Sequence, residues 1–141
     1  MSGRKFFDSN VLVYRFDQDE PLKRDRARDL LREEGRAGRL VLSTQVLQEF
    51  YVSATRKLSS PLSETDALEA VRHFSVFPVV QIDPELITDA IVLSRDHQIS
   101  LWDALILHAA ARAGCDTVLT EDLQDRWKVL GLEVVNPFAG L

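Results

Sequence analysis

Short apolar segments alternate with longer amphipathic segments along the whole chain, and this alternation constrains the fold more than any other feature. The longer segments begin with capping residues or proline and carry apolar residues at helical spacing. Strands separated by helices predict a parallel sheet with right-handed crossovers. We therefore expect an α/β fold with a central parallel β-sheet of four to five strands, flanked by helices on both faces. The predicted strands are residues 5–7, 39–43, 78–82, 117–120 and 132–135.

Six helices are expected between these strands, and the second of them is rich in charge. Its basic residues are interleaved with acids, including Glu33 and Glu34, that offset their charge. We interpret this run as a solvated helix face; the other interpretation is that some of its arginines contact substrate. The predicted helices are residues 11–16, 22–35, 45–57, 63–75, 84–96 and 100–113.

The composition is typical of one globular domain, so residues 1–141 are assigned to a single domain. Hydrophobic residues make up 45% of the chain and charged residues 28%. No apolar segment is long enough to span a bilayer or to act as a secretion signal, so we expect a cytoplasmic protein without membrane association. The net charge of −5 argues against binding nucleic acid by bulk electrostatics. Acids gathered in one pocket and neutralised by a metal would reduce that repulsion.

The cysteine and the histidines do not predict a catalytic or zinc-binding site. Cys115 has no partner for an internal disulfide and is expected to be a small buried thiol. His73, His97 and His108 lack the spacing of zinc ligands, so we expect them on the surface or on helix flanks.

Two aspartates follow predicted strands. Asp8 comes directly after residues 5–7, and Asp122 follows residues 117–120. The carboxyl ends of parallel strands are where open α/β sheets bind their ligands. Taken alone, Asp8 could simply cap the helix that follows it. A functional interpretation depends on other acids reaching the same edge of the sheet.

Two further acids lie on predicted helices. Glu49 is at the shoulder of the apolar arc of its helix, just beyond the end of the second strand. Asp103 is on the apolar face of its helix, nearly opposite His108. Ser100 and Asp103 match a capping box, which is a purely structural explanation for this acid. A carboxylate turned toward a packed face costs several kcal/mol unless it is compensated, so we favour a functional role.

A cluster of carboxylates at one edge of the sheet predicts a site for a hard cation. Two unit charges about 4 Å apart repel by about 4 kcal/mol at an effective dielectric constant of about 20, so such a cluster holds either protons or a cation. Carboxylate oxygens without cysteine or histidine select Mg²⁺, or Mn²⁺ as the alternative. Magnesium prefers one or two carboxylates, several waters and a phosphate, so the cluster indicates phosphate chemistry.

The motifs that carry these acids resemble those of PIN-domain proteins, and among them the VapC-type toxin ribonucleases. The resemblance covers essentially the full length, and its specificity comes from four motifs in the right order. It rests on residues 6–14 (FFDSNVLVY), 43–50 (STQVLQEF), 101–104 (LWDA), 119–123 (LTEDL) and the ending VNPF at 135–138. It implies one PIN domain with a central parallel sheet, commonly a homodimer, that is inhibited by a cognate VapB-type antitoxin.

The resemblance also implies an activity and the residues that carry it. The protein would be a Mg²⁺-dependent endoribonuclease, in which a metal-activated water attacks phosphorus in line in the RNA. The catalytic and metal-binding acids would be Asp8, Asp103, Glu49 and Asp122. The residues that orient these carboxylates or their waters would be Ser9, Asn10 and Thr120.

Other functions share parts of this pattern. A phosphatase of the aspartyl-phosphate class needs a second aspartate two residues after the first, where this chain has Asn10. A phospho-receiver domain has no need of a buried acid such as Asp103. The remaining alternative is a catalytically inactive PIN-like module that binds RNA or protein. The chain departs from the family pattern at Asp125, where relatives often have histidine or an aromatic residue, and we interpret Asp125 as a surface acid.

Overall fold

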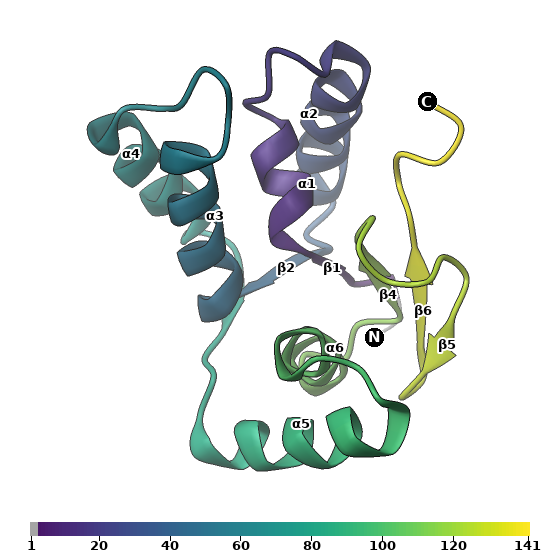
Figure 1. Ribbon diagram of the computed structural model, residues 1–141. Coiled ribbons are helices and arrows are strands. Elements are labelled where there is room, and N and C mark those ends of the chain that lie inside the picture. The colour runs from purple at the N-terminus through teal and green to yellow at the C-terminus, as the bar shows by residue number, and fades with distance from the viewer. Residues whose placement is uncertain (1–2) are drawn as a thin grey trace.

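The computed structural model describes residues 3–141, so Met1 and Ser2 of the predicted domain lie outside the described residues. It contains a six-stranded sheet with the order β3-β2-β1-β4-β6-β5 (Figure 1). The strands are β1 (Lys5–Phe7), β2 (Leu40–Ser43), β3 (Val79–Val80), β4 (Thr117–Leu119), β5 (Lys128–Val129) and β6 (Leu132–Val135). The helices are α1 (Ser9–Tyr14), α2 (Pro21–Arg36), α3 (Thr44–Arg56), α4 (Glu64–Phe74), α5 (Pro84–His97) and α6 (Leu101–Arg112). The predicted α/β fold with a mostly parallel central sheet is confirmed.

Helices flank the sheet on both faces, as predicted. Phe6 and Phe7 are consecutive in β1, so their side chains point to opposite faces, and both are fully buried. Figure 1 shows α5 and α6 on one side of the sheet and α1 and α2 on the other. Because both faces are covered, β1 has two consecutive apolar residues after Lys5 instead of an alternation of apolar and polar residues.

The register of the central strands brings the ends of β1 and β4 together. Phe7 lies opposite Leu119 in the parallel pair, and the chain continues into Asp8 on one side and Thr120 on the other. The Asp8 amide donates to the Leu119 carbonyl at 3.0 Å, which extends the pairing by one bond. The polar residues that follow these two strands therefore meet at one edge of the sheet.

The sheet has one strand that the sequence did not predict. β5 pairs antiparallel with β6, and the connection uses Leu130 and Gly131, which both have positive φ, 54° and 74°. Two-residue hairpins commonly need this conformation, but leucine is an unusual residue in it. β5 has only two residues, so neither the strand nor its turn has a recognisable sequence pattern. β3 is also shorter than predicted, with two residues paired.

The cysteine and the histidines lie close to where the sequence placed them. Cys115 is buried, and burial raises the pKa of its thiol to about 11. His73 and His97 are exposed, and His108 is partly buried on α6. In the described part of the chain, none of the helices has the length and hydrophobicity needed to cross a membrane.

Glu34 is buried, so the expected solvated face of α2 needs a correction at this position. Its carboxylate accepts hydrogen bonds from Lys5 Nζ at 3.0 Å and from Arg39 Nε at 2.7 Å. Burial alone would raise the pKa of Glu34, but the hydrogen bonds from Arg39 and Lys5 outweigh it and the pKa is lowered. These bonds tie the end of α2 to β1 and to the residue before β2. The charge pattern of α2 did not reveal Glu34 because its partners lie outside that helix.

We expect Glu34→Ala to lower the free energy of unfolding by about 2 kcal/mol, because two charge-assisted hydrogen bonds are lost. Urea denaturation at pH 7 measures the loss. Because the native pKa is lowered, the difference from wild type should shrink as the pH falls below the usual value of 4.5. Glu33→Ala, on the exposed side of the same turn, is the matched control and should change stability by less than about 0.5 kcal/mol. Equal losses in the two variants would contradict the assignment.

Candidate functional site

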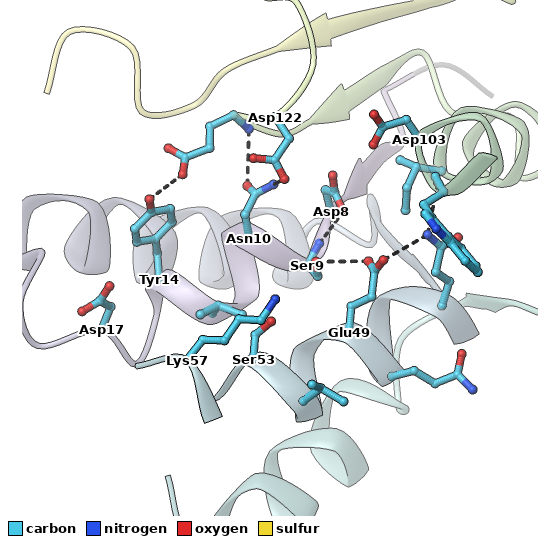
Figure 2. Close-up of a pocket in the computed structure, with 17 residues that line it drawn as sticks. Asp8, Ser9, Asn10, Tyr14, Asp17, Glu49, Ser53, Lys57, Asp103 and Asp122 are labelled. Carbon is cyan, nitrogen blue, oxygen red and sulfur yellow. Dashed lines mark hydrogen bonds between the residues drawn. The ribbon is translucent and has the colours of Figure 1, made fainter. Parts of the chain in front are cut away.

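A cavity of about 600 Å³ opens at the edge of the sheet where β1, β2 and β4 end. Its walls come from α1, α3, α6 and the segment after β4. All four acids singled out in the sequence line this cavity, and Figure 2 shows their carboxylates arranged around one space. They are Asp8, Glu49, Asp103 and Asp122. The fold therefore brings together carboxylates from four separate parts of the chain.

Asp8 is the most buried of these acids, with 5% of its surface exposed. The Ser9 amide donates to its Oδ1 at 2.7 Å, and the Thr120 hydroxyl donates to its Oδ2 at 2.9 Å. Within residues 3–141, Asp8 has no ion pair with a lysine or arginine. Burial, with smaller contributions from the negative charges of Glu49 and Asp122, raises the pKa of Asp8 to about 7. Near neutral pH this carboxylate is therefore balanced between its protonated and its ionised form.

The Thr120 hydroxyl connects Asp8 to the segment that carries Asp122. It donates to Asp8 and accepts from Asn10 Nδ2 at 2.9 Å and from the Asp122 amide at 3.1 Å. A hydroxyl has one donor and two acceptor positions, so Thr120 uses its full capacity. Because Thr120 is fully buried, this network holds the Asp8 carboxylate in one orientation.

Asn10 holds Asp122 in the cavity. Its Nδ2 donates to Asp122 Oδ2 at 3.2 Å, and its Oδ1 accepts from the Glu121 amide at 3.4 Å. Figure 2 shows Asn10 projecting from α1 toward Asp122. The aspartate after β4 is therefore oriented by a helix that follows β1.

Glu49 is held through both of its carboxylate oxygens. The Ser9 hydroxyl donates to Oε1 at 3.2 Å, and Gln45 Nε2 donates to Oε2 at 3.2 Å. Ser43 caps α3 by accepting from the Val46 amide at 3.3 Å, so the helix begins directly where β2 ends. Glu49 lies one turn after Gln45 and consequently faces the cavity rather than solvent.

Asp103 both stands at the start of its helix and lines the cavity. Its amide donates to the Ser100 hydroxyl at 3.0 Å, as expected for the start of a helix. Its carboxylate is partly buried and lines the cavity. Burial raises the pKa of Asp103, and the charge of Asp122 adds to the effect. The structural explanation therefore does not compete with the functional one.

Glu121 and two residues around it, Tyr14 and Lys23, were given no role by the sequence analysis. The Glu121 carboxylate accepts from the Tyr14 hydroxyl and from Lys23 Nζ, the latter at 3.0 Å. Lys23 also lies over the Tyr14 ring, 4.7 Å from its centroid, and its hydrogen bond to Glu121 raises the pKa of its ammonium group. The charge of Glu121 is thus offset by Lys23, whereas the neighbouring Asp122 stays turned toward the cavity. No local pattern marks Lys23 among the other basic residues of α2.

Asp125 does not belong to the cavity. It is exposed, and its carboxylate accepts from the Asn136 amide at 2.8 Å. The interpretation of this residue as a surface acid therefore agrees with its position.

The donor set of the cavity fits a hard cation that keeps part of its water shell. Six aspartates and glutamates line it, with Lys57 as the one lysine or arginine in its lining. In the part of the chain that the structure describes, no three His, Cys, Asp or Glu side chains form a group that could hold a metal ion by themselves. Mg²⁺ commonly binds through one or two carboxylates and several waters, whereas Zn²⁺ sites use three or four protein ligands, most often Cys or His. Among these carboxylates, Asp8 and Asp103 are the main candidates for direct Mg²⁺ ligands.

Comparison with known proteins relates the chain to one family. A sequence model of the PIN domain matches residues 5–126. No curated protein sequence matches the chain.

Three solved structures are similar in fold. A toxin–antitoxin complex from Klebsiella pneumoniae superposes with a TM-score of 0.68 at 21% identity, over 95% of this chain and 98% of that one. DNA-bound VapBC from Salmonella typhimurium superposes with a TM-score of 0.65 at 18% identity, over 93% of this chain and 96% of that one. VapC20 from Mycobacterium tuberculosis, a sarcin–ricin loop cleaving toxin, superposes with a TM-score of 0.63 at 17% identity, over 81% of this chain and 86% of that one. At these identities the likeness concerns the fold.

The raised pKa of Asp8 predicts how stability depends on pH in EDTA. The unfolded chain releases this proton near the usual pKa of 3.8, but the native protein keeps it until about pH 7. The free energy of unfolding should therefore fall between about pH 4 and pH 7, by up to about 4 kcal/mol from this group.

Denaturation of wild type and Asp8→Asn across this pH range isolates the contribution of Asp8, because other groups titrate in both proteins. The wild type should lose more stability than the variant as the pH rises. Parallel pH profiles for the two proteins would show that Asp8 has an ordinary pKa.

Proposed function

This chain belongs to the PIN domain family, and from that membership and the cavity geometry we propose that it is a Mg²⁺-dependent endoribonuclease acting as the toxin of a VapBC-type toxin–antitoxin pair. The observation that carries the proposal is the buried Asp8 in a cavity shared with Glu49, Asp103 and Asp122. A buried carboxylate without a paired cation, such as Asp8, is costly, so a purely structural role would not favour this arrangement.

The acids would act by holding a divalent cation. Asp8 and Asp103 would bind it, with Glu49 and Asp122 completing the acidic pocket, and Mn²⁺ would substitute for Mg²⁺. When bound, the ion would act as a Lewis acid, which lowers the pKa of water and offsets the negative charge of the phosphate. Asp8 would release its proton as the cation binds, so affinity should rise as the pH rises through about 7.

The polar neighbours of the acids would reduce the reorganisation that binding requires. Thr120 holds Asp8, Asn10 holds Asp122 and Ser9 holds Glu49, each through a side-chain hydrogen bond. Carboxylates oriented in advance lose little further freedom when they take up a ligand. These three residues therefore position the site without being ligands themselves.

A cognate VapB-type antitoxin is the proposed protein partner. The structures similar to this chain include a Salmonella typhimurium VapBC and a FitAB, both bound to DNA. We propose that this chain also binds an antitoxin, and that it forms a homodimer, as is common among VapC-type proteins. The substrate would be RNA.

Incubation of the purified protein with single-stranded RNA in Mg²⁺ or Mn²⁺ should give cleavage that EDTA abolishes. Asp8→Asn and Asp103→Asn should each reduce the rate by about 100-fold or more, because each removes a proposed ligand. Asp125→Asn changes an acid outside the cavity and should leave the rate unchanged.

Cleavage that survives EDTA and both substitutions would indicate a contaminating nuclease and would refute the metal-dependent mechanism. RNA binding without cleavage in either metal would instead support the inactive module.

Trp102 favours single-stranded RNA as the substrate. It lies next to Asp103 at the cavity, and 63% of its surface is exposed. It does not belong to the buried core. An exposed aromatic ring can stack on an unpaired base, which is worth about 1–3 kcal/mol per base. Lys57 also lines the cavity, where its ammonium group would contact a phosphate.

We expect Trp102→Ala to weaken binding of single-stranded RNA by about 5- to 100-fold, with most of the affinity kept in Trp102→Phe. Fluorescence anisotropy with Ca²⁺ in place of Mg²⁺ measures the affinity. Val76→Ala, at a position 81% exposed and outside the cavity lining, is the control. Wild-type affinity in Trp102→Ala would exclude stacking on this residue.

A further inference from the structure

Gln45 is a polar residue of the cavity with no role in the function proposed above. It stands near the start of α3, and only 6% of its surface is exposed. Its Nε2 donates to Glu49 Oε2 at 3.2 Å and to the Trp102 carbonyl at 3.1 Å. Its Oε1 is buried and has no hydrogen-bond partner among residues 3–141.

The amide of Gln45 has only one favourable orientation. Turning it over would place Oε1 against the Glu49 carboxylate and the Trp102 carbonyl, which are both acceptors. The observed orientation satisfies both hydrogens of Nε2 and leaves Oε1 without a donor. A buried acceptor without a partner costs about 1–3 kcal/mol. The two donated bonds are therefore kept at the expense of an unsatisfied carbonyl.

These two bonds connect helices that otherwise meet mainly through the sheet. Both α3 and α6 pack against β2. Gln45 bridges them directly, because Glu49 belongs to α3 and Trp102 to the first turn of α6. Asp103 is the residue after Trp102, so the bridge relates the positions of two acids on opposite walls of the cavity.

Helix capping does not explain Gln45. The cap of α3 is Ser43, whose hydroxyl accepts from the Val46 amide. The other oxygen of Glu49 is held by Ser9 alone. Without Gln45, Glu49 would keep one of its two side-chain hydrogen bonds and could rotate away from the cavity.

We propose that Gln45 is a positioning residue that fixes Glu49 relative to the first turn of α6, and thereby sets the affinity of the acidic cavity for a divalent cation. This inference rests on the proposed function, because it needs the acids to bind a cation. Gln45 itself would not contact the ion.

The test is a titration of the protein with Mn²⁺ alone, in which free Mn²⁺ is followed by electron paramagnetic resonance. Gln45→Met should weaken Mn²⁺ binding by about 10-fold, the scale expected for residues that orient metal ligands. Its Tm in EDTA should stay within about 2 °C of wild type, since the unsatisfied carbonyl is removed together with the two donors. Gln48→Met is the matched control, because Gln48 lines the cavity from the same helix and is exposed.

A double-mutant cycle with Glu49→Gln tests whether Gln45 acts through Glu49. The double variant should lose less Mn²⁺ affinity than the sum of the single losses. Strictly additive losses would overturn the inference, as would wild-type Mn²⁺ affinity in Gln45→Met. If Gln45→Met and Gln45→Ala are both unfolded in EDTA, Gln45 is structural and the inference is wrong. A wild-type protein that binds no Mn²⁺ would refute the proposed function itself, which separates that failure from failure of the Gln45 inference alone.

Discussion

The candidate site depends on the burial of the Asp8 carboxylate at the end of β1. The register of β1 and β4 places Asp8 beside Thr120. The Thr120 hydroxyl and the Ser9 amide therefore each donate a hydrogen bond to one oxygen of the Asp8 carboxylate. These bonds reduce the cost of burial but do not remove it, since the pKa of Asp8 remains raised. Each fully buried large apolar side chain contributes about 1.5–3 kcal/mol. The neighbouring Phe6 and Phe7 are both fully buried, so the core around β1 can offset the destabilisation that this one acid causes.

The rest of the cavity is organised outward from Asp8 by polar side chains that each hold one acid. Thr120, which holds Asp8, also accepts a hydrogen bond from Asn10, and Asn10 donates to Asp122. On the other wall, Glu49 is held between Ser9 and Gln45. Glu121 sits among these acids but is paired with Lys23. The cavity therefore separates carboxylates that are neutralised by the protein from carboxylates that remain available to a ligand.

The sequence was informative wherever the determining interactions are local. Apolar runs, capping residues and helical periodicity were sufficient for the α/β fold, because each depends on neighbours within a few residues. The four acids could be selected because three of them stand at predictable ends of strands or helices and the fourth, Glu49, lies one turn into a helix. By contrast, the hydrogen bonds made by Glu34, Gln45 and Lys23 were not predicted from the sequence. Each contacts residues from other elements, and those contacts follow from strand order and helix packing, which periodicity does not determine.

The surplus of acids in the cavity also implies an order of events for the proposed reaction. Glu121 is paired with Lys23, but the five other carboxylates outnumber Lys57 and give a lining that would repel a phosphodiester at close range. Burial and desolvation strengthen that repulsion, and the net charge of −5 on the whole chain adds to it at longer range. A cation that binds first would offset part of this negative charge and would bind the phosphate directly, so that the phosphate could approach the carboxylates that had repelled it. RNA would then be drawn to the cavity by the bound cation together with Lys57, and not by an extended basic surface.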